Sequence, residues 1–247
     1  MREIAETIFP LWGDFLRRLT NNGSDTSGRG LLAAKNDHDP KEGTMAIYLV
    51  RHGKDEDGFR GGWSGRGLIV EGYRQSEKLG RYLQENRDVY NIHRIVSSDL
   101  QRALDTANEI AQSLDLPVHR SRDWRETNNG LIAGMPNEIV NERYPGLYFS
   151  SLRMDERYPG GESPIEFFTR IRETFEQLCE EQAASDHREH VLVVTHGGVI
   201  NVIYHVLKKL EWSNTNKSFP AANTSVHKVE HRDGKWQVTL ENVLPHL

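Results

Sequence analysis

The chain has 247 residues, of which 36% are hydrophobic and 27% are charged, and its formal net charge is −5. This length is sufficient to bury the core of one large domain or of two small ones. The mildly negative charge argues against general nucleic-acid binding, which depends on basic patches that neutralise phosphates. We therefore expect no nucleic-acid partner.

The cysteine count and the hydrophobic runs exclude further classes of protein. Cys179 is the single cysteine, so the chain contains no intramolecular disulfide framework and no multi-cysteine metal site. The longest apolar runs, at residues 47–50 and 191–194, are far shorter than the ~20 residues of a membrane span. No hydrophobic signal segment opens the sequence. We expect a soluble, cytoplasmic protein with no membrane partner.

The first 44 residues differ from the rest of the chain. Apolar residues in segment 4–19 follow helical spacing that Pro10 interrupts, and segment 20–44 is rich in the polar residues and glycine typical of a linker. Met45 opens a new apolar stretch. We expect residues 1–44 to be an appendage and residues 45–247 to form the folded domain.

From residue 46 onward, short apolar runs alternate with helical patterns. The expected strands are residues 47–50, 95–96, 191–195, 226–229 and 236–240, and the expected helices are 71–86, 100–114, one starting at Pro164, and 197–210. Apolar strands separated by helices predict a mostly parallel sheet that is covered on both faces. The predicted fold class is α/β, as a three-layer α/β/α sandwich with a small lid region near residues 125–160.

Two of the expected helices begin with the spacing of a capping box. Ser98 stands three residues before Gln101, and Ser163 stands three residues before Glu166. The second start also has a proline at the first helical position, where a missing N–H costs nothing. The spacing predicts that both serines cap the helix that follows them.

Side chains suited to phosphate chemistry follow three of the expected strands. Arg51 and His52 end the first strand, Arg102 comes shortly after the second, and His196 follows the third. Because ligands of parallel sheets bind at the carboxyl ends of the strands, we expect these groups to converge. Arginine presents a fork of donors that matches phosphate oxygens, and a neutral imidazole is a competent nucleophile near pH 7. The set predicts an imidazole that attacks a bound phosphate dianion.

Four segments in this order resemble the histidine phosphatase superfamily, in its phosphoglycerate-mutase-like branch. They are Leu-Val-Arg-His-Gly at residues 49–53, Ser-Ser-Asp-Leu-Gln-Arg-Ala-Leu-Asp-Thr-Ala at 97–107, Gly-Gly-Glu-Ser at 160–163 and Val-Val-Thr-His-Gly-Gly at 193–198. An Arg-His-Gly tripeptide alone is a weak signal, whereas the ordered set is a specific one. The resemblance covers roughly residues 46–247 and excludes the first 44.

The resemblance implies a role for each matching residue. His52 would be the phosphorylated nucleophile, Arg51 and Arg102 would bind the phosphate, and His196 would stabilise charge on the transferring group. The family's proton donor lies in a segment that corresponds here to residues 124–130, which makes Glu126 the expected general acid. No metal and no cofactor are implied, because the arginines and His196 supply the positive charge.

The sequence departs from the family pattern after His52. Many members carry an Asn there that touches the phosphate, and this chain has none in residues 54–63. We expect Arg60 to take over this phosphate contact. The connection at residues 130–162 is shorter than in the mutases of the family, which favours a phosphatase.

The combined prediction is a metal-independent phosphomonoesterase that acts on small phosphorylated metabolites through a phosphohistidine. Phosphoglycerate-mutase-type phosphoryl transfer and a non-catalytic phosphoester-binding module remain open alternatives.

Taken singly, His52 reads as a packed core residue, Arg102 as a surface arginine and Glu126 as a solvated loop acid. Residues 147–149 either cover the pocket or belong to the core. The substrate and the oligomeric state are not encoded in any readable motif.

Overall fold

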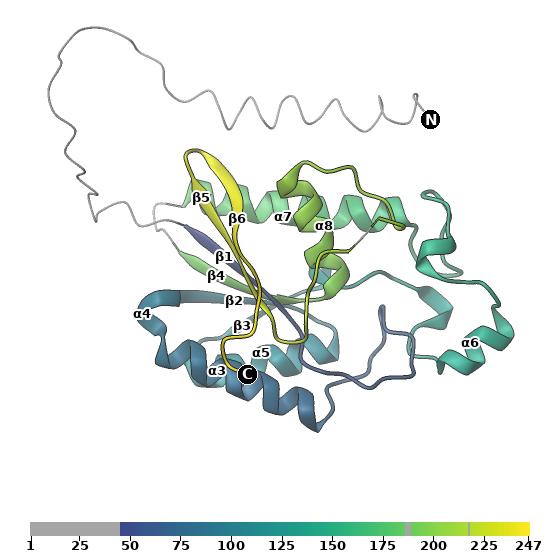
Figure 1. Cartoon of the computed structure of the whole chain (residues 1–247), viewed down its shortest axis with the longest axis horizontal. Helices are drawn as coiled ribbons and strands as arrows, with labels where there is room; N and C mark the ends of the chain where they lie inside the picture. Colours follow the sequence, from purple (N-terminus) through teal and green to yellow (C-terminus); the bar gives the residue numbers. More distant parts are fainter. Residues whose placement is uncertain (1–44, 186–188, 217) are drawn as a thin grey trace, which may run out of the picture.

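The computed structural model describes residues 45–185, 189–216 and 218–247. The prediction of an appendage concerns residues 1–44, which lie outside this part. In the described part, a six-stranded sheet has the order β3-β2-β4-β1-β5-β6 (Figure 1). Its strands are β1 (Ala46–Arg51), β2 (Ile92–Ser98), β3 (Val118–Ser121), β4 (His190–Thr195), β5 (Val226–Arg232) and β6 (Lys235–Val243).

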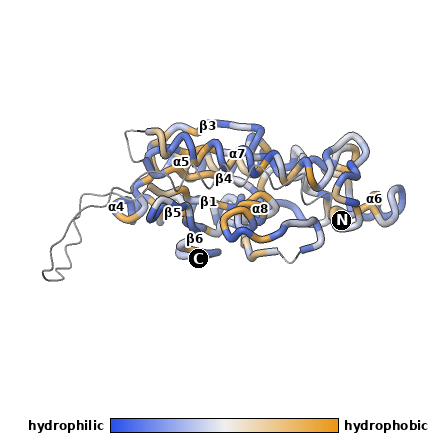
Figure 2. Tube along the Cα trace, turned by 90° about the horizontal axis from the view of Figure 1, so that it is seen from above, coloured by the Kyte–Doolittle hydropathy of each residue, from blue (hydrophilic) through white to orange (hydrophobic). Residues whose placement is uncertain are grey.

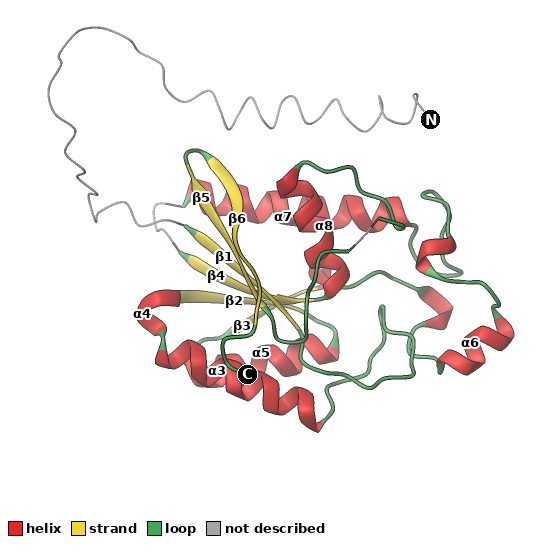
Figure 3. Cartoon of the chain, viewed as in Figure 1, coloured by secondary structure: helices red, strands yellow, loops and turns green. Residues whose placement is uncertain are grey.

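Helices lie on both faces of this sheet, and α6 lies beyond it (Figure 3). They are α3 (Val70–Glu85), α4 (Arg87–Tyr90), α5 (Gln101–Leu114), α6 (Asn137–Arg143), α7 (Pro164–Ala184) and α8 (Gly197–Lys208). Helices α3 and α5 pack together below the sheet in Figure 1, and α7 and α8 lie above it. The predicted three-layer α/β/α arrangement is therefore confirmed.

Strands β1, β2, β3 and β4 are parallel, whereas β5 runs antiparallel to β1 and forms a hairpin with β6. The first five residues of β1 are all buried, because helices cover both faces of the sheet. Ile47 and Leu49 join the core under α7 and α8, while Tyr48 and Val50 join the core under α3 and α5. The hydrophobic colour of α8 in Figure 2 matches its buried position against the first of these cores.

The two expected capping boxes have different outcomes. Ser163 caps α7 as predicted: its Oγ accepts from the Glu166 N–H at 3.3 Å, and Glu166 accepts from the Ser163 N–H at 2.9 Å. The prediction for Ser98 is wrong, because the N-cap of α5 is Leu100 and carries no side-chain cap. Ser98 is instead the last residue of β2, and its hydroxyl points to a histidine of the site described below.

Residues 125–160 form a small unit beyond the carboxyl ends of the strands. This unit contains α6 and two short 3₁₀ helices, η2 (Gly130–Ile132) and η3 (Phe149–Ser151), and a third 3₁₀ helix, η1 (Arg122–Trp124), precedes it. It has a hydrophobic cluster of its own, separate from the two sheet cores. Among residues 45–185, 189–216 and 218–247, no helix combines the length and hydrophobicity needed to cross a bilayer.

Candidate active site

His52 is the first residue after β1, and both of its ring nitrogens are engaged. Its Nδ1–H donates to the carbonyl oxygen of Gly53 at 2.8 Å, which leaves the lone pair on Nε2. That Nε2 atom accepts from the Nε–H of Arg102 at 3.2 Å. The side chain is only 4% exposed, yet it lines a cavity of about 450 Å³. The backbone position thus fixes the tautomer that a nucleophilic Nε2 requires.

Burial and two neighbouring cations keep the His52 ring neutral. Removal from water lowers the pKa of His52 well below its usual value, and the charges of Arg102 and Arg51 lower it further. The imidazole is therefore unprotonated near pH 7, and its Nε2 lone pair accepts the hydrogen bond from Arg102.

Arg102 lies in the first turn of α5 and is 2% exposed. Its Nη2 donates to the carbonyl of Gly62 at 2.9 Å and its Nη1 to that of Ser64 at 3.4 Å. Asp55 lies 3.6 Å from its Nε and partly balances the buried charge. The loop between β1 and α3 thus wraps around this guanidinium, which a buried cation needs.

His196 follows β4 and is the N-cap residue of α8. It is completely buried, and the centroid of its ring lies 5.2 Å from that of His52. Its Nε2 hydrogen-bonds the Ser98 hydroxyl at 2.8 Å, and its Nδ1 has no partner. Burial lowers the pKa of His196 well below its usual value, and the charge of Arg102 adds to the effect. Strands β2 and β4 are neighbours, and this adjacency brings Ser98 to His196.

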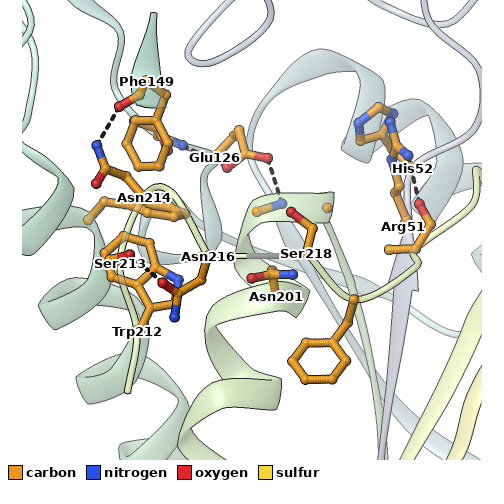
Figure 4. Close-up of a pocket in the computed structure, with 16 residues that line it drawn as sticks. Arg51, His52, Glu126, Phe149, Asn201, Trp212, Ser213, Asn214, Asn216 and Ser218 are labelled. Carbon is orange, nitrogen blue, oxygen red and sulfur yellow. Dashed lines mark hydrogen bonds between the residues drawn. The ribbon is translucent and has the colours of Figure 1, made fainter. Parts of the chain in front are cut away.

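Arg51 and Glu126 line the same cavity as His52 (Figure 4). Arg51 donates from Nη1 to the carbonyl of Ala221 at 2.7 Å, while its buried Nε has no partner. The carboxyl group of Glu126 accepts from the N–H of Gly198 at 3.0 Å, at the start of α8. A Cβ at position 198 would collide with this carboxyl group, so the glycine leaves room for it.

Arg60 does not join the other predicted residues. Its Nη2 donates to Asn141 at 3.1 Å, and its guanidinium lies over the ring of Tyr148 at 4.8 Å. It is not among the residues that line the cavity. The structure therefore brings Arg51, His52, Arg102, His196 and Glu126 together and places Arg60 against α6 instead.

Comparisons with known proteins show the family of the chain. The model of the histidine phosphatase superfamily, branch 1, matches residues 47–244. The chain belongs to the histidine phosphatase superfamily. The metal-independent phosphoserine phosphatase of Arabidopsis thaliana is 34% identical over 218 residues, covering 81% of this chain and 82% of that protein. Phosphoglycerate mutase-like protein 4 of the same plant is 30% identical over 210 residues, covering 81% and 86%.

Solved structures of similar proteins share the fold of this superfamily. The mycobacterial glucosyl-3-phosphoglycerate phosphatase in complex with VO3 has a TM-score of 0.65 at 25% identity, with 81% of this chain and 99% of that chain covered. A putative alpha-ribazole-5'-P phosphatase from Escherichia coli has a TM-score of 0.68 at 18% identity, with 82% and 98% covered. The family and its named phosphatase members identify this histidine phosphatase superfamily chain as a phosphatase.

Three residues that sequence reasoning missed hold the site of this phosphatase together. The Asn223 Nδ2 donates to the backbone oxygen of His52 at 3.0 Å, and Thr106 accepts from the N–H of Gly53 at 2.9 Å. The Arg170 Nη2 donates to the backbone oxygen of Glu126 at 3.2 Å. Thr106 stands in the motif at residues 97–107 and was identifiable there, whereas nothing in the sequence around Asn223 or Arg170 predicts these contacts.

No group of three or more His, Cys, Asp or Glu side chains that could hold a metal ion occurs within the described part of the chain. Cys179 is buried on α7, and burial raises the pKa of its thiol well above the usual value. A thiol in this state is a poor nucleophile. The ionisable groups brought together at the site are two imidazoles, two guanidinium groups and one carboxyl group.

The rest of the cavity is lined by aromatic and uncharged polar side chains. Phe149 and Trp212 lie on the side away from His52, and Asn201 lies between the two sides (Figure 4). Phe167 also lines the cavity, and its ring lies against those of Phe149 and Trp212. Of residues 147–149, whose place the sequence left open, Phe149 lines the cavity. This aromatic lining comes from segments that carry no family motif.

Proposed function

We propose that the protein hydrolyses small phosphate monoesters without a metal ion, through a phosphohistidine on His52. The observation that carries this proposal is the His52 ring, whose Nδ1–H is held by Gly53 and whose Nε2 lone pair faces Arg102 beside an open cavity. The buried guanidinium of Arg102 and the partly buried one of Arg51, beside an unprotonated imidazole, suit the charge of a phosphate dianion.

In the first step, the Nε–H of Arg102 leaves the Nε2 of His52 for a phosphoryl oxygen, and the freed Nε2 lone pair attacks phosphorus. The Nε2–P bond forms, the bond between phosphorus and the ester oxygen breaks, and protonated Glu126 gives its proton to the departing oxygen. The Gly53 carbonyl, as acceptor of the Nδ1–H, stabilises the positive charge that develops on the ring. Arg51, Arg102 and His196 stabilise the charge on the phosphoryl oxygens.

In the second step, water replaces the alcohol. The Glu126 carboxylate takes a proton from water as its oxygen attacks phosphorus, and the Nε2–P bond breaks. Inorganic phosphate leaves, His52 regains its neutral ring and Glu126 is protonated for the next cycle. A mutase differs only in this step, because an alcohol rather than water receives the phosphoryl group.

The decisive experiment measures phosphate release from p-nitrophenyl phosphate in the presence of EDTA. The wild-type protein should release nitrophenol, and His52→Ala should reduce the rate by about a thousandfold or more, because the nucleophile is lost. The matched control is His119→Ala, which removes an exposed histidine of β3 and should leave the rate unchanged.

The phosphoenzyme itself separates the remaining alternatives. An adduct trapped with wild-type protein should be labile in acid and stable in alkali, as a phosphoramidate is. A non-catalytic binding module would release no nitrophenol, and a mutase would transfer the phosphoryl group to an added alcohol faster than to water. An acid-stable adduct, or full activity of His52→Ala, would contradict the proposal.

We also propose the cytoplasm as the site of this activity.

A further inference from the structure

The cavity has two chemically different ends (Figure 4). We call the part lined by Arg51, His52 and Glu126 the phosphate end, and the part lined by Phe149, Phe167 and Trp212 the aromatic end. If the phosphoryl group lies at His52, the alcohol portion of the ester extends away from it along the cavity. The aromatic end is therefore placed to receive the leaving group.

The rings of the aromatic end are held in fixed relation to one another. The ring centroids of Phe149 and Phe167 lie 6.0 Å apart at 87°, and those of Phe149 and Trp212 lie 6.3 Å apart at 53°. One face of Trp212 stacks on Phe168, at 5.1 Å and 22°. Trp212 is nevertheless only half-buried and lines the cavity. Part of its surface is thus free to contact a bound ring.

Two loops that carry this aromatic surface are tied together. The Nδ2 of Asn214 donates to the backbone oxygens of Phe149 and Leu152, at 2.6 and 2.8 Å. These bonds join the loop after α8 to the η3 segment. Because the rings are positioned before a ligand arrives, little conformational entropy is lost when they contact it.

Asn201 offers the cavity an unused hydrogen-bond donor. Its Nδ2 is buried and has no partner, although Asn201 lines the cavity one turn into α8. A buried donor without a partner is costly, and a ligand oxygen would satisfy it once the Asn201 amide turns toward the cavity. Among the described lining residues, the charged or titratable ones are Arg51, His52 and Glu126, all at the phosphate end. Lys217, in the loop after α8, lies outside the described residues.

We propose that this site selects phosphate monoesters of uncharged, ring-bearing alcohols of the sugar or nucleoside type. The inference rests on the proposed function and adds the leaving group to it. The ring of the alcohol packs against Trp212 and Phe149, and an oxygen beside the ring accepts from the Nδ2 of Asn201. Short acyclic acids such as phosphoserine and 3-phosphoglycerate offer no ring to this surface.

The first test compares 2-phenylethyl phosphate with propyl phosphate. Both leave as primary alcohols of similar basicity, so the ratio of their kcat/KM values reports contact with the ring. Trp212→Leu should lower this ratio by about tenfold, because it removes the aromatic contact. The ratio does not depend on the fraction of folded protein. The matched control, Trp236→Leu, changes a buried tryptophan of β6 and should not alter the ratio.

The second test uses Asn201→Ala with esters that carry a polar ring. The loss of kcat/KM should be about five- to tenfold greater for a hexose 6-phosphate or a nucleoside 5'-monophosphate than for 2-phenylethyl phosphate, which has no acceptor. The better of the two polar substrates in the wild-type protein distinguishes a sugar from a nucleoside.

The outcomes separate this inference from the proposed function. Equal losses for the ring-bearing and the acyclic ester in Trp212→Leu would overturn the inference. So would a higher kcat/KM for phosphoserine or 3-phosphoglycerate than for every ring-bearing ester. In both cases His52-dependent hydrolysis would still stand. Absence of turnover of every ester, or turnover that survives His52→Ala, would overturn the proposed function and this inference with it.

Discussion

The two ends of the cavity are built in different ways. The phosphate end is supplied by the carboxyl ends of parallel strands and the starts of the helices that follow, as for His52, Arg102 and His196. The aromatic end comes from the η3 segment, the start of α7 and the loop after α8, which carry Phe149, Phe167 and Trp212. Chemistry is thus placed on the rigid sheet edge, and the choice of leaving group is left mostly to connections that vary independently of it.

The hydrogen bonding of the two ends differs as well. At the phosphate end, Arg102 meets Gly62, Ser64 and the Nε2 of His52, so its buried charge is well compensated. Toward the aromatic end, the Nδ2 of Asn201 remains unpaired. The two ends thus differ in the compensation of a buried charge, but both contain buried polar atoms without a partner, since the Nε of Arg51 and the Nδ1 of His196 are also unpaired.

Among the variants that distinguish the two ends of the cavity, Arg102→Ala is expected to change kcat/KM the most. It should lower kcat/KM by about a thousandfold or more for every ester tested, because each contains the same phosphoryl group. Arg102→Lys keeps the charge without the planar fork, so it should recover only part of the activity. The measurement is kcat/KM for propyl and 2-phenylethyl phosphate, alongside Arg81→Ala, an exposed arginine of α3. Losses that differ between the two esters would show that the ends are not independent.

Glu126→Gln should produce the next largest effect, and this effect should depend on the leaving group. A propyl phosphate needs a proton on its departing oxygen, so its turnover should fall by about a hundredfold or more. The kcat/KM of p-nitrophenyl phosphate should hardly change, because it reports the first step and nitrophenolate leaves without a proton. Glu138→Gln, at an exposed position of α6, is the control. Equal slowing of both esters would refute the assignment of Glu126 as the acid.

The smallest effect is on stability, and it concerns the phosphate end. Burial lowers the pKa of His52 and His196, and that of His227 to about 4, whereas the unfolded chain binds protons near pH 6.5. Below pH 6.5 these histidines therefore bind protons in the unfolded state but not in the folded state. The free energy of unfolding should fall with pH, by up to about 1.4 kcal/mol per pH unit for each such histidine.

Urea unfolding between pH 7 and pH 5 measures this slope. His52→Asn should reduce the slope, because one neutral buried imidazole is removed, whereas His119→Gln at an exposed position should not. Above pH 6.5 these histidines contribute no pH dependence, since both states are then neutral. An unchanged slope in His52→Asn would mean that the folded protein protonates His52 as readily as the unfolded chain does.

For Arg60 and Ser98, the contacts expected from the local sequence pattern differ from the contacts in the tertiary structure. The sequence predicted Arg60 as a phosphate ligand, and its role stays a prediction, but the structure turns its guanidinium to Asn141 and Tyr148. Ser98 has capping-box spacing, yet the chain needs Leu100 as the N-cap, which frees the Ser98 hydroxyl for His196. Both outcomes depend on neighbours remote in the sequence, which spacing alone does not encode.

The sequence by itself determined the mostly parallel sheet, the convergence of His52, Arg102 and His196, and the elements of the described part other than β3, α4, α6 and the 3₁₀ helices. It could do so because apolar periodicity defines the elements and because parallel strands bring their carboxyl ends to one edge. Only the tertiary structure decided which tautomer His52 adopts, that Asn201 keeps a free donor, and that Phe149 meets Trp212 across the cavity. These depend on distances between loops, and loop geometry follows from packing against the whole fold rather than from local pattern.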